Sequence, residues 1–255
     1  MKRFVADFHV HTLLSPCAGV EMTPRNIILN ALECGIDIVA ITDHNACDNV
    51  AAALKAAEGR NVTVIPGMEV ESKEEVHLLT LFSNLVQLKQ WEAFVMEHRS
   101  GLANDERKFG AQFIVDELDE FIAVKPEMLL ASLSCSVSQV ATRVAELGGI
   151  CIASHIDRPA YSILSQLGFI PDEIPLTAVE VTGRVKAKEA HSRYLGLRNL
   201  PVISSSDAHS MEAFITGPKM VLYIEEPTIE EIQKALAGLD SRKAVVTSRW
   251  QGTSM

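Results

Sequence analysis

The chain has 255 residues, of which 47% are hydrophobic and 22% charged, a composition that fits one sizeable core in a soluble globular protein. A net charge of -10 and a pI near 5.3 predict that a long nucleic acid is not a partner, although a small phosphorylated ligand can still bind at a local positive site. The N-terminus is too polar for a signal peptide and no run approaches membrane-span length, so we expect a cytoplasmic protein with no membrane partner. Its 5 cysteines are odd in number and unclustered, which argues against a disulfide framework or a thiolate zinc site.

Strand-like apolar runs alternate with helical patterns from the N-terminus onward. The runs cover residues 5–10, 36–42, 61–70, 77–82, 148–154, 176–182 and 200–206. This order predicts parallel strands joined by crossover helices, arranged as a barrel or a large open sheet. Thr23 and Pro24 are typical of a helix start, and Gly35 lies where that helix should end.

Residues 1–246 are expected to form a single domain. The segment 84–147 is too long for one crossover, and we interpret it as an insertion that either covers a site or adds structural bulk. Residues 247–255 are expected to form a weakly ordered tail.

The first strand-like run continues into DFHVHT, residues 7–12. Strict alternation places Asp7, His9 and His11 on one face of a strand, with Phe8 and Val10 on the other. Leaving such polar groups unpaired in a core costs about 1–3 kcal/mol each, and a bound metal ion would satisfy both imidazoles.

Six of the 8 histidines lie in or just after these runs, as do one glutamate and one aspartate. The set is His9, His11, His44, Glu69, His77, His155, Asp207 and His209. The C-terminal ends of barrel strands share one rim, so we expect these side chains to meet there. Imidazole and carboxylate without thiolate suit zinc, manganese or iron, and eight ligands exceed the needs of one ion. Each histidine taken alone would more often be structural, and Glu69 could instead be a solvated carboxylate.

Asp7 and Asp43 lie beside candidate ligands in the sequence. We expect both to orient an imidazole as hydrogen-bond acceptors rather than to bind metal. Glu180, at the end of the run 176–182, is expected to line the rim.

Six segments taken together, DFHVHT, ITDHN, GMEVE, EVHLL, ASHIDRP and SSDAHS, resemble in this order the PHP family, named for polymerase and histidinol phosphatase. The resemblance implies an α/β fold, a distorted seven-stranded TIM-like β/α barrel. It also implies a cofactor of two or three divalent metal ions, zinc, manganese or iron, and phosphoesterase chemistry.

The resemblance also implies how the ligands divide among the ions. The first ion takes His9, His11 and Asp207, and the second takes His77 and His155 with Glu69 as a bridge. A third ion would be held by His44 and His209.

The third site departs from the family pattern. The family usually reads HTxxSDG, whereas this chain reads HTLLSPCAGVE, with Pro16 in the place of the aspartate. Either the third site is empty, or Cys17 or Glu21 replaces the carboxylate. Cys17 could equally be a small buried apolar residue.

The implied reaction is hydrolysis of a small phosphorylated substrate, a phosphomonoester or a nucleotide, by a hydroxide that several metal ions activate. Asp207 and Arg158 are the expected catalytic residues, with Arg158 binding the substrate phosphate through its planar guanidinium unless it makes a surface salt bridge. Arg184 and Lys186 are weaker candidates for that role. Two alternatives stay open: an amidohydrolase, although no lysine ends a strand-like run as a bridging ligand would, and a regulatory protein that binds metal without turnover.

Overall fold

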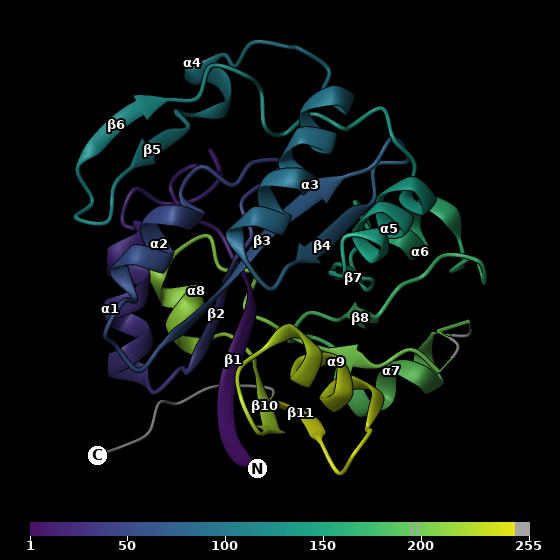
Figure 1. Cartoon of the computed structure of the whole chain (residues 1–255). Coiled ribbons are helices and arrows are strands. Elements are labelled where there is room, and N and C mark those ends of the chain that lie inside the picture. Colours follow the sequence, from purple (N-terminus) through teal and green to yellow (C-terminus); the bar gives the residue numbers. More distant parts are fainter. Residues whose placement is uncertain (195, 198, 248–255) are drawn as a thin grey trace.

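A computed structural model describes residues 1–194, 196–197 and 199–247. Its main sheet has nine strands in the order β11-β10-β1-β2-β3-β4-β7-β8-β9, and a separate hairpin pairs β5 with β6 (Figure 1). The strands are β1 Lys2–Val10, β2 Ile38–Ile41, β3 Thr63–Glu71, β4 His77–Leu81, β5 Phe113–Val115, β6 Phe121–Val124, β7 Ile150–Ala153, β8 Ala178–Glu180, β9 Val202–Ile203, β10 Lys219–Ile224 and β11 Lys243–Thr247. Thr247 thus ends a strand, and the rest of the predicted tail, 248–255, lies outside the described residues.

Seven of the nine strands curl into a barrel. The run from β1 through β2, β3, β4, β7 and β8 to β9 returns to β1, because Ala208, just after β9, bridges Val10. His11 N donates to Ala208 O at 3.0 Å, and Ala208 N donates to His9 O at 3.2 Å. Strands β10 and β11 add an antiparallel extension beside the first half of β1. The predicted distorted seven-stranded β/α barrel is confirmed.

One barrel strand runs against the others. β4 pairs antiparallel with both β3 and β7, because only five residues separate it from β3 and so short a link makes a hairpin rather than a crossover. The expectation of an entirely parallel barrel is therefore wrong at this strand. Its register places His77 opposite Glu71, so the start of β4 lies at the rim where β3 ends.

Helices cover the outside of the barrel (Figure 1). They are α1 Pro24–Cys34, α2 Val50–Ala56, α3 Leu85–His98, α4 Glu106–Phe109, α5 Val137–Glu146, α6 Ile163–Leu167, α7 Ala187–Arg193, α8 Met211–Thr216 and α9 Ile229–Ala237. The Thr23 hydroxyl caps α1 by accepting from Asn26 N, and Gly35 ends it with a φ of 67°. None of these helices, within the described part of the chain, is long and apolar enough to cross a membrane.

The register of β1 shifts between Asp7 and Val10. Ala6 and Phe8 pack with Ile38 and other strand residues in one core cluster, whereas Val10 packs in the cluster beneath the helices. Strict alternation along this strand is therefore wrong, because an irregularity of one residue exchanges the two faces. The shift lets His9 and His11 face the barrel rim while Asp7 points elsewhere.

The segment 84–147 contains α3, α4, β5, β6 and α5. Its longer helices add to the core through buried residues such as Trp91 and Val140. Its hairpin region contacts the loops that follow β1 and β2: Phe113 N donates to Leu13 O at 3.2 Å, and Asn45 Nδ2 donates to Leu129 O at 2.9 Å. The inserted segment thus lies beside the loops that carry histidines.

Candidate metal centre

Glu69, near the end of β3, lies at the centre of the predicted site and is 1% exposed. Its Oε1 faces three imidazoles, at 3.2 Å from His9 Nε2, 3.3 Å from His77 Nδ1 and 3.4 Å from His155 Nε2. These rings come from β1, from the start of β4 and from the loop that follows β7. Three strands of the barrel therefore present nitrogen atoms to one carboxylate oxygen.

The second oxygen of Glu69 faces another set. Its Oε2 lies 3.4 Å from His11 Nε2 and 3.3 Å from His44 Nδ1. The loop after β2 is held against β3 by backbone hydrogen bonds, including Asn45 N to Glu69 O at 2.8 Å, and this fixes His44 beside the carboxylate. One carboxylate thus lies between two groups of imidazoles, as a ligand that bridges two ions would.

Asp207 completes the cluster from the segment after β9. Its Oδ1 lies 3.2 Å from His9 Nε2, 3.4 Å from His11 Nε2 and 3.6 Å from His209 Nδ1. Both Asp207 and His155 adopt left-handed backbone conformations, with φ of 49° and 29°. Such conformations cost about 1–3 kcal/mol and concentrate at functional sites.

The arrangement of these donor atoms suits metal binding better than it suits hydrogen bonds among the side chains. Three groups bring their ligand atoms within 4.8 Å: His9, His11, Glu69 and Asp207; His44, Glu69 and His77; and His11, His44 and His209. Among the described residues, several of these buried atoms have no hydrogen-bond partner: Glu69 Oε1, His77 Nδ1 and both ring nitrogens of His155. Buried polar atoms are nearly always paired, so this convergence of unpaired donors is what a metal site requires. Seven of the eight predicted ligands belong to these groups, and the eighth, His155, lies 3.4 Å from Glu69 Oε1.

The third group contains imidazoles alone. Neither Cys17 nor Glu21 contributes an atom to any of the three groups in the described chain, and both residues are exposed. Cys17 is therefore not the buried apolar residue of the alternative interpretation. The Glu21 carboxylate instead lies over Gly19, where an added Cβ would be 2.3 Å from Oε2.

A second layer of side chains orients the candidate ligands. Glu180, the last residue of β8, is 1% exposed, and its Oε2 lies 2.9 Å from His9 Nδ1. Ser15 Oγ lies 3.0 Å from His11 Nδ1 and donates to Asp43 Oδ1 at 2.7 Å. Asp43 therefore supports an imidazole through a serine. Such contacts fix ring orientation and raise ligand basicity.

Asp7 contacts a lysine rather than an imidazole. Its Oδ2 lies 3.0 Å from Lys219 Nζ, and both side chains are fully buried. Its Oδ1 accepts from the backbone N–H groups of His9 and Ser206, at 3.4 Å and 3.1 Å. Because the shift in β1 turns it away from the rim, Asp7 holds the first strand against the segment after β9.

The surroundings raise the pKa of some histidines in the cluster and lower the pKa of others. Although burial opposes ionisation, the imidazoles of His9 and His77 hold the pKa of Glu69 well below its usual range. Burial also works against a charged His77, but Glu69 and Glu71 raise its pKa to about 9. For His209, burial and the neighbouring His11 lower the pKa to about 4, so this ring is neutral at pH 7.

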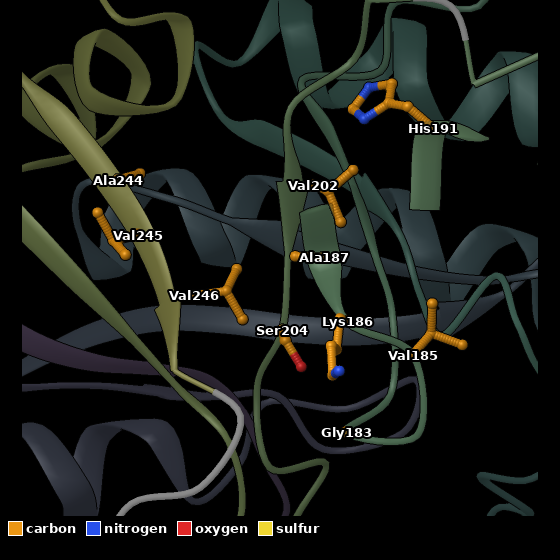
Figure 2. Close-up of a pocket in the computed structure, with 10 residues that line it drawn as sticks. All are labelled: Gly183, Val185, Lys186, Ala187, His191, Val202, Ser204, Ala244, Val245 and Val246. Carbon is orange, nitrogen blue, oxygen red and sulfur yellow. The ribbon is translucent and has the colours of Figure 1, made fainter. Parts of the chain in front are cut away.

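The three predicted phosphate-binding residues lie in different surroundings. Arg158 Nη2 makes an ion pair with Asp207 Oδ2, and its side chain is 43% exposed at the edge of the cluster. Arg184 is exposed in the loop after β8. Lys186, 67% exposed, lies 3.6 Å from Glu189 and lines a separate cavity of about 690 Å³ between α7 and the edge strands β9 and β11 (Figure 2). None of the candidate ligands lines that cavity. Of the three, Arg158 alone contacts a candidate ligand.

Sequence reasoning missed two contacts of His77. Glu71 Oε2 lies 3.5 Å from His77 Nε2, and the Tyr161 ring stacks on the His77 ring at 4.8 Å between centroids. Glu71 could have been found from strand periodicity, because it shares a strand face with Glu69. Tyr161 follows ASHIDRP in a loop, and no periodic signal marks it.

Comparison with known families shows to which family the chain belongs. The family model of the PHP domain matches residues 7–173, which include six of the eight candidate ligands and the support from Asp43. The chain belongs to the PHP domain family. A comparison with curated protein sequences gives no match.

Solved structures share the PHP fold of this chain at low sequence identity. A lesion-specific endonuclease, endonuclease Q from Pyrococcus furiosus, matches with a TM-score of 0.67 and 21% identity over 95% of this chain. The chain spans 58% of that endonuclease. A candidate metal-dependent phosphoesterase from Bifidobacterium adolescentis matches with a TM-score of 0.55 and 20% identity, over 80% of this chain and 87% of the other.

A third similar structure is an amidohydrolase from Chromobacterium violaceum solved with bound sulfate. It matches with a TM-score of 0.56 and 18% identity, over 81% of this chain and 88% of the other. The PHP fold of this chain is therefore one on which metal-dependent hydrolases are built, and the fold alone does not select the bond that is cleaved.

The comparisons correct the prediction drawn from net charge. Endonuclease Q is also solved with a 27-mer duplex that has an abasic lesion at the active site, with the same 21% identity and TM-score of 0.67. The exclusion of long nucleic acids is therefore wrong for this fold. A net charge of -10 is a sum over the whole chain, whereas contact with a phosphate backbone depends on the local distribution of charge.

Proposed function

We propose that this chain is a metal-dependent phosphoesterase whose substrate phosphate binds between the Glu69 cluster and Arg158. The observation that carries the proposal is the position of Glu69, with each carboxylate oxygen facing a separate set of imidazoles. A carboxylate placed in this way suits a site of at least two ions. Divalent cations held there would stabilise negative charge on a phosphate and lower the pKa of water.

The protein's own residues would then position the substrate. Arg158 offers a planar donor fork, and its ion pair with Asp207 shows that the guanidinium reaches the edge of the ligand cluster. Buried Glu180 and Ser15 hold the rings of His9 and His11 from behind. Arg158 therefore places a positive charge at the exposed edge of the cluster, where an anionic substrate would bind.

Phosphate esters fit this site better than amides. Amidohydrolases typically rely on a bridging lysine, whereas here the carboxylate of Glu69 lies between the two sets of imidazoles. Fully buried Lys219 instead pairs with Asp7 and donates to Phe214 O at 2.7 Å. Imidazole and carboxylate donors leave zinc, manganese and iron as the candidate ions.

Ester hydrolysis by the protein loaded with manganese or zinc tests the proposal, measured as phosphate release for monoesters and as formation of the cleaved product for a diester or a duplex. The substrates are small phosphomonoesters, nucleoside monophosphates, a phosphodiester and a duplex with an abasic site, which together separate the substrate classes. We expect His77→Ala and Asp207→Ala to abolish turnover of whichever substrate is cleaved. His98→Ala is the matched control, because His98 lies on α3 and its Nδ1 contacts Phe94 O.

Full turnover in both site variants would overturn the assignment. Bound metal without hydrolysis of any substrate would instead favour a regulatory protein that keeps the metal site. The missing carboxylate in the group formed by His11, His44 and His209 is the observation that makes this second candidate worth testing.

A further inference from the structure

One exposed aromatic side chain lies directly beside the ligand cluster. Tyr161 is 46% exposed, and its ring stacks on His77 with 4.8 Å between centroids and 24° between the planes. The other exposed aromatic side chains of the described residues, Phe109, Phe121, Phe169 and Tyr223, have no ring contact with a candidate ligand. Among these exposed aromatic side chains of the described residues, Tyr161 is therefore the one whose ring contacts a candidate ligand.

The loop that carries Tyr161 is held firmly at both ends. Ile156 N donates to Glu180 O at 2.8 Å, and the Ser162 hydroxyl donates to Arg158 O at 2.8 Å. Tyr161 O accepts the backbone N–H of His77 at 2.9 Å. These bonds join the loop to β8 and β4, so the ring has a fixed place at the rim.

The backbone of Tyr161 is in the left-handed region, with a φ of 58°. A bulky side chain is disfavoured there, and such conformations persist where the surroundings impose them. The Tyr161 side chain still leaves 46% of its surface exposed. A conformation that keeps an aromatic ring beside a metal site is typical of a functional position.

The same loop presents two different groups to the site. Arg158 reaches Asp207 on one side of the cluster, and Tyr161 reaches His77 on another. A guanidinium suits a phosphate, and an aromatic ring suits a planar group attached to it. The stacking contact with His77 uses only one face of the tyrosine ring.

We propose that Tyr161 is a specificity-determining residue that stacks on a planar ring of the substrate, such as a nucleobase, while the phosphate lies at the Glu69 cluster. This inference rests on the proposed function for the location of the phosphate. It narrows the substrate class to phosphoric esters that carry an aromatic heterocycle. Stacking of a base on an aromatic side chain is tolerant of base identity, so we expect preference for nucleotides over alkyl phosphates without strict selection of one base.

A binding experiment tests the inference without turnover. Calorimetry on the zinc-loaded protein compares a methylene phosphonate of adenosine, which cannot be hydrolysed, with methylphosphonate. We expect Tyr161→Leu to raise the Kd of the adenosine compound roughly 10-fold and to leave that of methylphosphonate unchanged. Tyr161→Phe should keep wild-type affinity for both. Tyr223→Leu is the matched control, because Tyr223 is 40% exposed on β10.

Three results would overturn the role of Tyr161. They are an unchanged ratio of the two Kd values in Tyr161→Leu, an equal loss of both affinities together with zinc, and failure of the wild-type protein to bind the adenosine compound. The second would show that Tyr161 only supports His77. A wild-type protein that binds both ligands but hydrolyses no ester would contradict the proposed function and leave the stacking result to stand by itself.

Discussion

Glu180 Oε2 lies 2.9 Å from His9 Nδ1, and the same oxygen accepts the backbone N–H of His155 at 3.2 Å. One buried carboxylate thus supports two candidate ligands that come from β1 and from the loop after β7. The contact favours the His9 tautomer that carries its proton on Nδ1, which leaves the Nε2 lone pair directed toward Glu69 and Asp207.

Removal of the Glu180 charge should weaken metal binding. We predict that Glu180→Gln lowers zinc affinity about 10-fold. This loss is near the lower end of the range for residues that support metal ligands, because the amide oxygen can still accept from His9 Nδ1. Competition with a chromophoric chelator measures the change. Glu225→Gln, on an exposed residue after β10, is the control, and equal zinc affinity in both variants would contradict a role for Glu180.

Loss of the Arg158 guanidinium should affect substrate more than metal. We predict that Arg158→Ala raises KM at least about 10-fold with metal content unchanged, because hydrogen bonds to charged groups contribute about 1.5–3 kcal/mol. Steady-state kinetics and metal analysis of the same sample test this. Arg107→Ala changes an arginine that is 93% exposed in the inserted segment and should behave as wild type. An unchanged KM in Arg158→Ala would leave Arg158 as a surface ion pair.

The candidate ligands could be predicted because strand ends repeat a simple pattern. HVH and DAH each place two donors two residues apart, and each of the other candidate ligands adjoins an apolar run. The barrel then brings the runs together at one rim, as its geometry demands. The structure brings all eight residues into a single cluster.

The remaining features depend on contacts that periodicity does not encode. The short link before His77 reverses β4, and the register shift in β1 separates Asp7 from His9. Glu180 is recognisable as an acid at a strand end, but its partner His9 is 171 residues away in the sequence. Tyr161 lies in a loop whose path is set by hydrogen bonds to two strands.

The pair of Asp7 and Lys219 should be essential for stability. Lys219 Nζ, fully buried, also donates to Phe214 O at 2.7 Å and to Gly217 O at 3.1 Å. Lys219→Met would leave the Asp7 charge buried without a partner, and we predict a loss of about 3–5 kcal/mol in the free energy of unfolding. Urea titration of the metal-free protein measures it.

A second variant separates the charge from the packing in this pair. Asp7→Asn combined with Lys219→Met removes both charges, so we expect it to be more stable than Lys219→Met alone. Lys243→Met, at the exposed start of β11, controls for loss of a surface lysine. A double variant no more stable than Lys219→Met would show that the ammonium acts through the carbonyl groups it contacts.

Bound metal should abolish the dependence of stability on pH that His77 produces. Burial works against a charged His77, but Glu69 and Glu71 raise its pKa to about 9 from 6.5 in the unfolded chain. In metal-free protein the stabilisation from protonated His77 is therefore fully present below pH 6.5 and is lost as the pH rises to about 9. Metal binds the neutral imidazole, so its affinity, and the stability it adds, increase over the same range.

Thermal unfolding in chelator and in buffered zinc, across the interval from pH 6.5 to about 9, tests this prediction. We expect Tm to fall with pH in chelator, and we expect the difference in Tm between the zinc and chelator series to widen. His77→Gln should flatten the fall in chelator, because glutamine has no proton to lose in this interval, and His98→Gln should not. If the Tm of the chelated protein stayed constant or rose, protonated His77 would not stabilise the metal-free site, and Glu69 would have to be held by its other imidazole neighbours.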